Sequence, residues 1–234
     1  MGSSTSTNQF WLSSKLAKWS SCPESALTIV KGAFTSRLAM QDFLVDVIQC
    51  LTASAVPTVW ALRNADKSKS GSMSSTADLM KYITFQALRL SGALKTEKQM
   101  ALCYSQFHTA RTSKEWLIMF RQVVEHLGGQ IYIVVDLATV RASFEDVQGF
   151  NFILELSKML QKASEQGMAT KIKVMLLVYE AEWSIILPSE VYGSLILVKA
   201  MRQKRRQGNT MRRTIPTQVF SSSRGRLGRI RQGR

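Results

Sequence analysis

The residues of this chain that could do chemistry are an acid at the end of one apolar run and a glycine-led segment well before it. Asp136 directly follows the apolar residues 131–135. A carboxylate at the end of a buried parallel strand is well placed to bind the magnesium ion that accompanies a transferred phosphate. The same carboxylate could instead cap a nearby loop or helix amide. The sequence leaves both roles open.

The segment Gly32-Ala33-Phe34-Thr35-Ser36-Arg37-Leu38-Ala39 stands where a phosphate-binding loop would precede a helix. A working loop reads G-x-x-x-x-G-K-[ST], in which backbone amides surround the phosphates and the lysine neutralises them. Counting from Gly32, Arg37 replaces the second glycine, Leu38 the lysine and Ala39 the magnesium-binding hydroxyl. Gly32, Thr35, Ser36 and Arg37 remain as candidate nucleotide contacts, and Arg37 has the alternative role of an exposed helix arginine.

Other kinds of site find little support in the sequence. The three cysteines, Cys22, Cys50 and Cys103, form no C-x-x-C pair, and His108 and His126 lack a recognisable nucleophile nearby. A structural zinc site needs four ligands at suitable spacings. We therefore expect no catalytic residue, no metal site and no cofactor. ATP with magnesium enters only under the alternative function given below.

Apolar runs alternate along the chain with segments of helical periodicity. Strands are expected at residues 26–30, 56–62, 131–135, 172–179 and 195–198, and helices at 40–51, 77–90, 112–127 and 150–166. Thr112-Ser113-Lys114-Glu115 has the spacing of a capping box at the start of one helix. Strands that alternate with helices predict an α/β fold with a mainly parallel, five-stranded sheet. Trp60, Trp116 and Trp183 are interpreted as packing residues more than as stacking platforms.

The positive charge is concentrated at the C-terminal end. The net charge is +15, and residues 199–234 contain 12 of the 31 Lys and Arg residues and no acid. With so few apolar residues this segment is expected to be a disordered basic tail. Nucleic-acid contact, nuclear import and the absence of a specific role all remain open for it. The residues that would carry the first two roles are Lys204, Arg205, Arg206, Arg212, Arg213, Arg224, Arg226 and Arg229.

These observations predict three parts: a mobile N-terminal arm at residues 1–22, an α/β domain at 23–198 and the basic tail at 199–234. The first residues lack the basic and apolar regions of a secretory signal. No apolar stretch reaches the length of about 20 residues that a spanning helix needs. We therefore expect an intracellular protein, cytoplasmic or nuclear, without a membrane partner.

The order of the pieces resembles the NACHT-type, STAND-class P-loop NTPase modules of fungal multidomain proteins. Leu79-Met80-Lys81-Tyr82-Ile83-Thr84-Phe85-Gln86-Ala87-Leu88 looks like the family's LLRSLIYQLL helix. Residues 131–136 look like its Walker B strand, and 171–179 like the sensor strand that follows. The resemblance covers about residues 27–198. It implies a three-layer P-loop NTPase-like sandwich with the strand order 5-1-4-3-2.

The chain departs from this family at the residues that hydrolyse nucleotide. Members carry further acids just after the Walker B Asp, whereas no acid follows Asp136 before Glu145. Their sensor strand tends to end in Ser/Thr-Arg, and here the strand is followed by Tyr179-Glu180. Without the loop lysine, the hydroxyl and the second acid, the positioning and charge neutralisation of phosphoryl transfer are missing.

Three functions remain as hypotheses. The first is a non-catalytic, pseudo-NTPase interaction or signalling module with protein partners that the sequence does not identify. The second is a divergent ATP- or GTP-binding switch, with Gly32, Thr35, Ser36 and Arg37 on the phosphates and Asp136 on magnesium. The third is a protein that binds nucleic acid nonspecifically through its basic tail.

Overall fold

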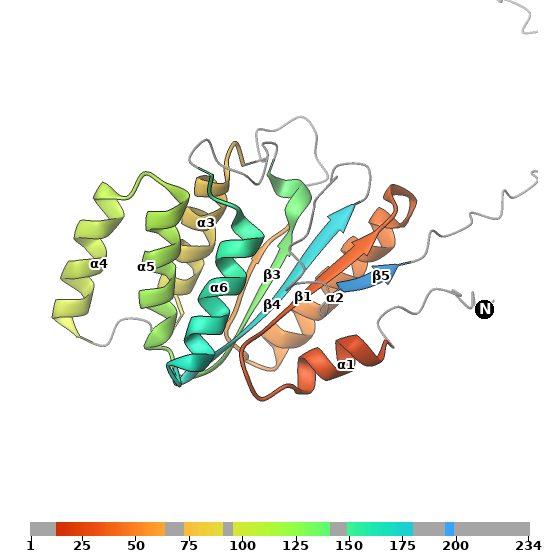
Figure 1. Cartoon of the computed structure of the whole chain (residues 1–234), viewed down its shortest axis with the longest axis horizontal. Helices are drawn as coiled ribbons and strands as arrows, with labels where there is room; N and C mark the ends of the chain where they lie inside the picture. The colour runs from red at the N-terminus through yellow and green to blue at the C-terminus, as the bar shows by residue number, and fades with distance from the viewer. Residues whose placement is uncertain (1–12, 64–72, 91–95, 141–148, 180–194, 199–234) are drawn as a thin grey trace, which may run out of the picture. The chain divides into compact units, whose positions relative to one another are not determined.

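The computed structural model describes residues 13–63, 73–90, 96–140, 149–179 and 195–198. The strands in these segments are β1 (Ala26–Gly32), β2 (Thr58–Ala61), β3 (Gly129–Asp136), β4 (Thr170–Tyr179) and β5 (Leu195–Val198). They form one sheet in the order β2-β3-β4-β1-β5, and every neighbouring pair is parallel (Figure 1). The predicted order 5-1-4-3-2 and the P-loop NTPase-like α/β fold are thereby confirmed.

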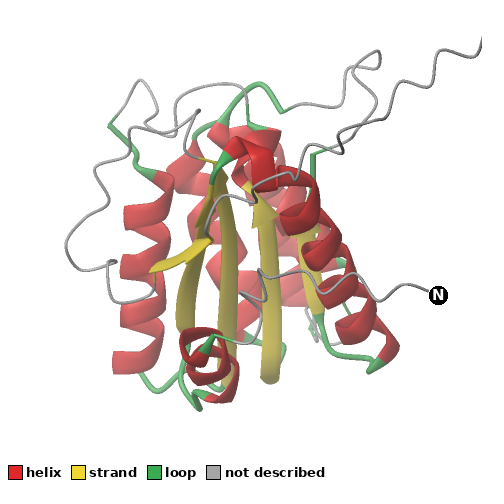
Figure 2. Ribbon diagram, turned by 90° about the vertical axis from the view of Figure 1, so that its right-hand side faces the viewer, coloured by secondary structure: helices red, strands yellow, loops and turns green. Residues whose placement is uncertain are grey.

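Helices cover both faces of the sheet (Figure 2). On one face lie α1 (Ser14–Ser21) and α2 (Arg37–Ala53). On the other lie α3 (Thr76–Leu88), α5 (Ser113–Glu125) and α6 (Phe152–Glu165), while α4 (Glu97–Thr109) packs beside α5 (Figure 1). The chain turns to opposite faces after β1 and β3 because parallel strands are joined by right-handed crossovers and these connections run in opposite directions across the sheet.

Burial on both faces explains why the central strands are continuously apolar. In β3, Ile131, Ile133 and Val135 belong to the core under α3, α5 and α6, whereas Val134 belongs to the core under α2. Successive side chains of a strand point to opposite faces, so a strand covered on both sides needs apolar residues at every position.

Local signals set the ends of the helices. At the start of α5, Glu115 N donates to Thr112 Oγ1 at 3.2 Å and Thr112 N donates to Glu115 Oε2 at 3.0 Å. This reciprocal pair confirms the predicted capping box. Beyond the other end of α5, Gly128 and Gly129 have φ values of 70° and 66°, which side chains with a Cβ rarely adopt.

The described part of the predicted N-terminal arm includes helix α1. Trp19 of this helix is 8% exposed and donates from Nε1 to Ala26 O at 3.1 Å. Its ring meets Tyr132 edge-on, with the centroids 5.8 Å apart. Apolar burial and a long-range hydrogen bond thus hold α1 to the sheet. The beginning of the arm, residues 1–12, lies outside the described residues.

A buried lysine binds the end of the same helix. Lys173 of β4 is fully buried and its Nζ donates to Trp19 O at 3.1 Å and to Cys22 O. Cations suit the C-terminal end of a helix, where carbonyl groups lack helical partners. Burial lowers the pKa of Lys173, and smaller electrostatic contributions from Cys22 and Glu24 raise it.

Helix α4 was not predicted from the sequence, which shows no strong apolar stripe between residues 97 and 109. The chain divides into two compact units, Met1–Met201 and Arg202–Arg234. All described residues belong to the first. The basic tail, 199–234, with every arginine and lysine assigned to it, lies outside the described residues.

Candidate functional site

Open parallel sheets bind their ligands at the edge where the strands end and the chain turns to opposite faces. After β1 the chain passes through η2, a 3-10 helix (Phe34–Ser36), into α2. After β3 it passes through a second 3-10 helix, η3 (Leu137–Thr139). Gln41 of α2 donates from Nε2 to Asp136 Oδ2 at 3.0 Å. The structure therefore brings the segment around Gly32 and the acid to the same edge.

The connection from β1 to α2 is tightly packed around Gly32. A Cβ added to Gly32 would overlap Met40 Sδ and approach Val198 Cβ to 3.2 Å. The amide of Ser36 donates to Ala33 O at 2.9 Å, so this N–H already has a partner within the turn. Among the described residues, positive φ angles occur only outside this connection. The backbone therefore does not form the outward-facing ring of amides that surrounds a phosphate.

The remaining candidates in this segment lie in different surroundings. Thr35 is exposed, Ser36 is buried, and Arg37 is half-buried as the first residue of α2. Leu38, at the position of the lysine in a working loop, is 68% exposed. The segment thus presents an apolar side chain where a phosphate loop presents an ammonium group.

Asp136 is fully buried and its carboxylate is occupied by donors. Oδ1 accepts from Ala138 N at 3.0 Å and so caps η3. Oδ2 accepts from Gln41 Nε2 at 3.0 Å and, at the long distance of 3.5 Å, from the Tyr179 hydroxyl. Of the two roles left open by the sequence, the capping contact is the one that these bonds provide. A buried carboxylate requires such partners because its transfer out of water is costly.

Sequence reasoning missed two side chains that donate to this carboxylate, Gln41 and Tyr179. Tyr179 ends β4 and is fully buried, but it was considered only as a departure from the sensor motif. Gln41 shares its helix face with Leu44 and Ile48, which are both buried. A polar residue at the start of such an apolar stripe was the available signal, since residues three and seven positions apart lie on one face.

The donors to Asp136 include the side-chain amide of Gln41, the backbone amide of Ala138 and the phenol of Tyr179. No group of three or more His, Cys, Asp or Glu residues that could hold a metal ion occurs in the part of the chain that the structure describes. Within the same residues, no helix combines the length and the apolar character needed to cross a membrane.

The tryptophans bear out the packing interpretation in part. Trp116 is 3% exposed and packs in the core beneath α3 and α5. Trp60 on β2 is 37% exposed, at the margin of the sheet. Trp183 lies outside the described residues.

Comparisons with known proteins found a distant structural likeness and no match by sequence. No protein-family model matches the chain, and no curated protein matches it. One solved structure that it resembles is the ORC2 protein of Aeropyrum pernix in ADPNP–ADP complexes, with 13% sequence identity and a TM-score of 0.43. The match covers 80% of this chain and 45% of that one, so the chain spans less than half of the neighbour's length.

Proposed function

We propose that this chain is a non-catalytic module with a P-loop NTPase-like fold, of the NACHT/STAND type, that acts through contacts with protein partners. The observation that carries the proposal is the hydrogen bond from Gln41 Nε2 to Asp136 Oδ2 at 3.0 Å. This bond places the uncharged side-chain amide of Gln41, in α2, on the carboxylate oxygen that would otherwise be available to a magnesium ion. In this proposal the chain keeps the fold, and Asp136 stabilises it by accepting hydrogen bonds.

The residues at this edge do not fit a magnesium–triphosphate group. Leu38 and Ala39 stand in place of the lysine and the hydroxyl, and Met40 packs against Gly32 where a phosphate loop must stay open. The Asp136 carboxylate would have to give up Gln41 before it could bind a metal. Each lost charge-assisted contact removes about 1.5–3 kcal/mol of phosphate binding. Binding at cellular nucleotide concentrations is therefore not expected.

Equilibrium dialysis of the full chain against labelled ATP with magnesium tests the proposal, together with an assay of inorganic phosphate release. We expect no binding in the micromolar range and no release above the protein-free rate. Asp136→Asn removes the acid in question, and Asp42→Asn, which changes an exposed acid on α2, is the matched control. Micromolar binding with turnover that Asp136→Asn abolishes and Asp42→Asn preserves would overturn the proposal.

The nucleotide-switch alternative predicts a different result, which thermal melting measures. It requires ATP to raise the melting temperature without turnover, through phosphate contacts that include Arg37. Arg37→Ala would then abolish the rise. We expect no rise in the unsubstituted protein, so that Arg37→Ala has nothing to remove.

A further inference from the structure

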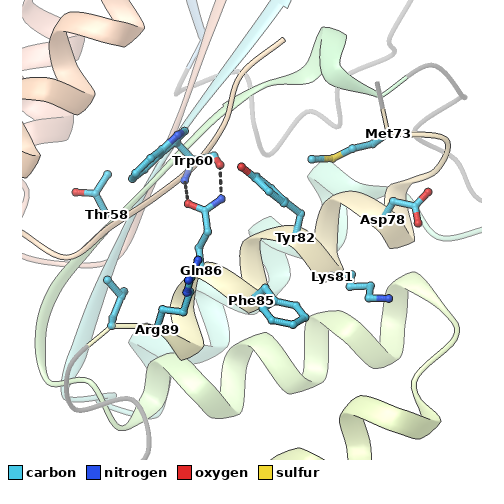
Figure 3. A pocket seen from close by; sticks show the side chains of 10 residues that line it. Thr58, Trp60, Met73, Asp78, Lys81, Tyr82, Phe85, Gln86 and Arg89 are labelled. Carbon is cyan, nitrogen blue, oxygen red and sulfur yellow. Dashed lines mark hydrogen bonds between the residues drawn. The ribbon is translucent and has the colours of Figure 1, made fainter. Parts of the chain in front are cut away.

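A hollow lies between the edge strand β2 and helix α3, away from the edge of the sheet that holds Asp136. Its volume is about 760 Å³, within the range of ligand pockets in proteins. Its lining includes Trp60 of β2, Met73, Tyr82 and Phe85 of α3, and Arg89, which follows the end of α3 (Figure 3). Tyr82 projects from the helix between Trp60 and Met73 in this view.

The walls of the hollow are aromatic and open to solvent. Trp60 is 37% exposed, Tyr82 44% and Phe85 47%. Tyr82 and Phe85 are three positions apart on α3 and so lie on one face of the helix. Scattered single apolar residues on a surface need no explanation, but a group of aromatic side chains around one hollow is typical of a binding site.

The charges in the hollow favour an anion. Arg89 lines it, and its guanidinium makes no hydrogen bond or ion pair with the described residues. Lys81 lies over the rings of Phe107 and Trp116, 6.0 and 5.8 Å from their centroids, and makes no ion pair with the described residues. Among the described residues of the lining, the remaining charged one is Asp78.

Asp78 is engaged at the start of α3. Its Oδ2 accepts from the hydroxyls of Ser74 and Ser75 and from Ser75 N. The bond from the Ser74 hydroxyl is the largest cause of the lowered pKa of Asp78. The acid therefore stays ionised as part of a helix cap, and the two cations of the lining outnumber it.

At the edge of the sheet beside this hollow, the side chain of Gln86 binds the backbone of Trp60. Gln86 Nε2 donates to Trp60 O at 2.6 Å, and Trp60 N donates to Gln86 Oε1 at 3.0 Å (Figure 3). A peptide that added itself as a strand would need these same two groups of Trp60. The side-chain amide thus occupies the outward hydrogen-bonding groups of Trp60, which favours a small molecule over an added strand at this point of the edge.

We propose that the hollow binds a low-molecular-weight amphipathic anion. Its apolar body packs against Trp60, Tyr82 and Phe85, and its carboxylate, sulfonate or phosphate group pairs with Arg89. The guanidinium of arginine matches such planar or tetrahedral anions through two parallel hydrogen bonds. This site is independent of the proposed function, because it shares no residue with the edge that holds Asp136.

The test uses the fluorescent anion 8-anilinonaphthalene-1-sulfonate on the full chain, with octanoate, octan-1-ol and acetate as competitors. Displacement, and not binding alone, is the readout, because the basic residues of the chain can also attract the probe. We expect octanoate to displace the bound probe, octan-1-ol to do so about tenfold less effectively, and acetate to have no effect. The factor of ten corresponds to one charge-assisted hydrogen bond at the lower end of its range.

Two variants test separately the contacts to the anionic head group and to the apolar body of the ligand. Arg89→Gln should weaken octanoate about tenfold and leave octan-1-ol unchanged, whereas Tyr82→Ala should weaken both about fivefold. Arg111→Gln and Ile118→Ala, which alter an exposed arginine and an exposed apolar residue elsewhere, are the matched controls and should change neither. Circular dichroism melts verify that all four variants fold.

The proposal is overturned if octanoate displaces no probe, or if it displaces the probe equally well from the unsubstituted protein, Arg89→Gln and Tyr82→Ala. A tenfold loss shared by Arg89→Gln and Arg111→Gln would also overturn it, because general charge attraction would then explain the binding. Nucleotide binding is measured separately, so neither result decides the other.

Discussion

Replacement of Asp136 by alanine should destabilise the fold strongly, because this acid serves as an internal acceptor. The change leaves Ala138 N without its bond in the interior and removes the acceptor of Gln41 Nε2 and of the Tyr179 hydroxyl. A buried donor left unsatisfied costs about 1–3 kcal/mol. Gln41 is half-buried and can regain water, and the Tyr179 contact is long, so we expect a total loss of about 3 kcal/mol in the free energy of unfolding.

Asparagine at position 136 separates the capping role from a metal-binding role. Its carbonyl oxygen can still accept from Ala138 N, and Gln41 can reverse its amide to accept from the new NH₂ group. We therefore expect Asp136→Asn to cost only about 1 kcal/mol, the net worth of a typical hydrogen bond. If the acid served only a bound metal, alanine and asparagine would affect the stability of the nucleotide-free protein equally.

Urea unfolding followed by circular dichroism measures these changes, and a double-mutant cycle with Gln41→Ala isolates the bond between the two side chains. We expect a coupling energy of about 1–2 kcal/mol between Gln41 and Asp136. Asp42→Asn, on the exposed side of α2, should change stability by less than about 0.5 kcal/mol. A coupling energy near zero, or an alanine variant as stable as the unsubstituted protein, would refute the structural role of this acid.

Three further predictions concern other parts of the fold. Gln86→Ala should lower the free energy of unfolding by about 1–2 kcal/mol and increase self-association in sedimentation velocity, because Trp60 N and O become free at the sheet edge. Gly32→Ala should cost about 1–3 kcal/mol in urea unfolding, because the new methyl group overlaps Met40 Sδ, and unchanged stability would mean that this turn is loosely packed. Burial lowers the pKa of Lys173 below 10.5, so the unfolded chain holds this proton more tightly than the folded protein does. Stability relative to Lys173→Met should therefore rise with pH between the lowered pKa and 10.5 when urea unfolding is repeated across that interval, and a fall would contradict the assignment.

The sheet could be predicted from the sequence because its signals are local. Residues 131–135 are apolar at every position, which in a strand requires cover on both faces. The Thr112–Glu115 pair marks a helix start through contacts only three residues apart. The strand order followed from the family resemblance, since strand periodicity alone does not determine which strands are neighbours.

Features that depend on distant contacts could not be predicted in the same way. The helix α1 is amphipathic but short, and an isolated helix of its length is unstable in water. It is held by Lys173 Nζ, which reaches Trp19 O from 154 positions along the chain. The hollow beside β2 likewise depends on Trp60 and Tyr82 coming together across two elements. Sequence reasoning treated Trp60 as a packing residue, although the strand order implied by the resemblance already placed its strand at the edge of the sheet.

The site at Asp136 shows why the loss of a motif does not reveal what replaces it. The sequence shows that the lysine and the hydroxyl of the phosphate loop are absent. It does not show which groups then bind the carboxylate of Asp136, which ends a strand buried on both faces. Such a group must find donors whether or not a nucleotide binds, since a charge cannot remain buried without partners. One such donor can come from the helix that follows β1, because this helix packs against β3. Gln41, a polar residue on the face that carries Leu44 and Ile48, meets that requirement. The same physical demand applies to any sheet of this order that keeps the acid after losing its phosphate loop.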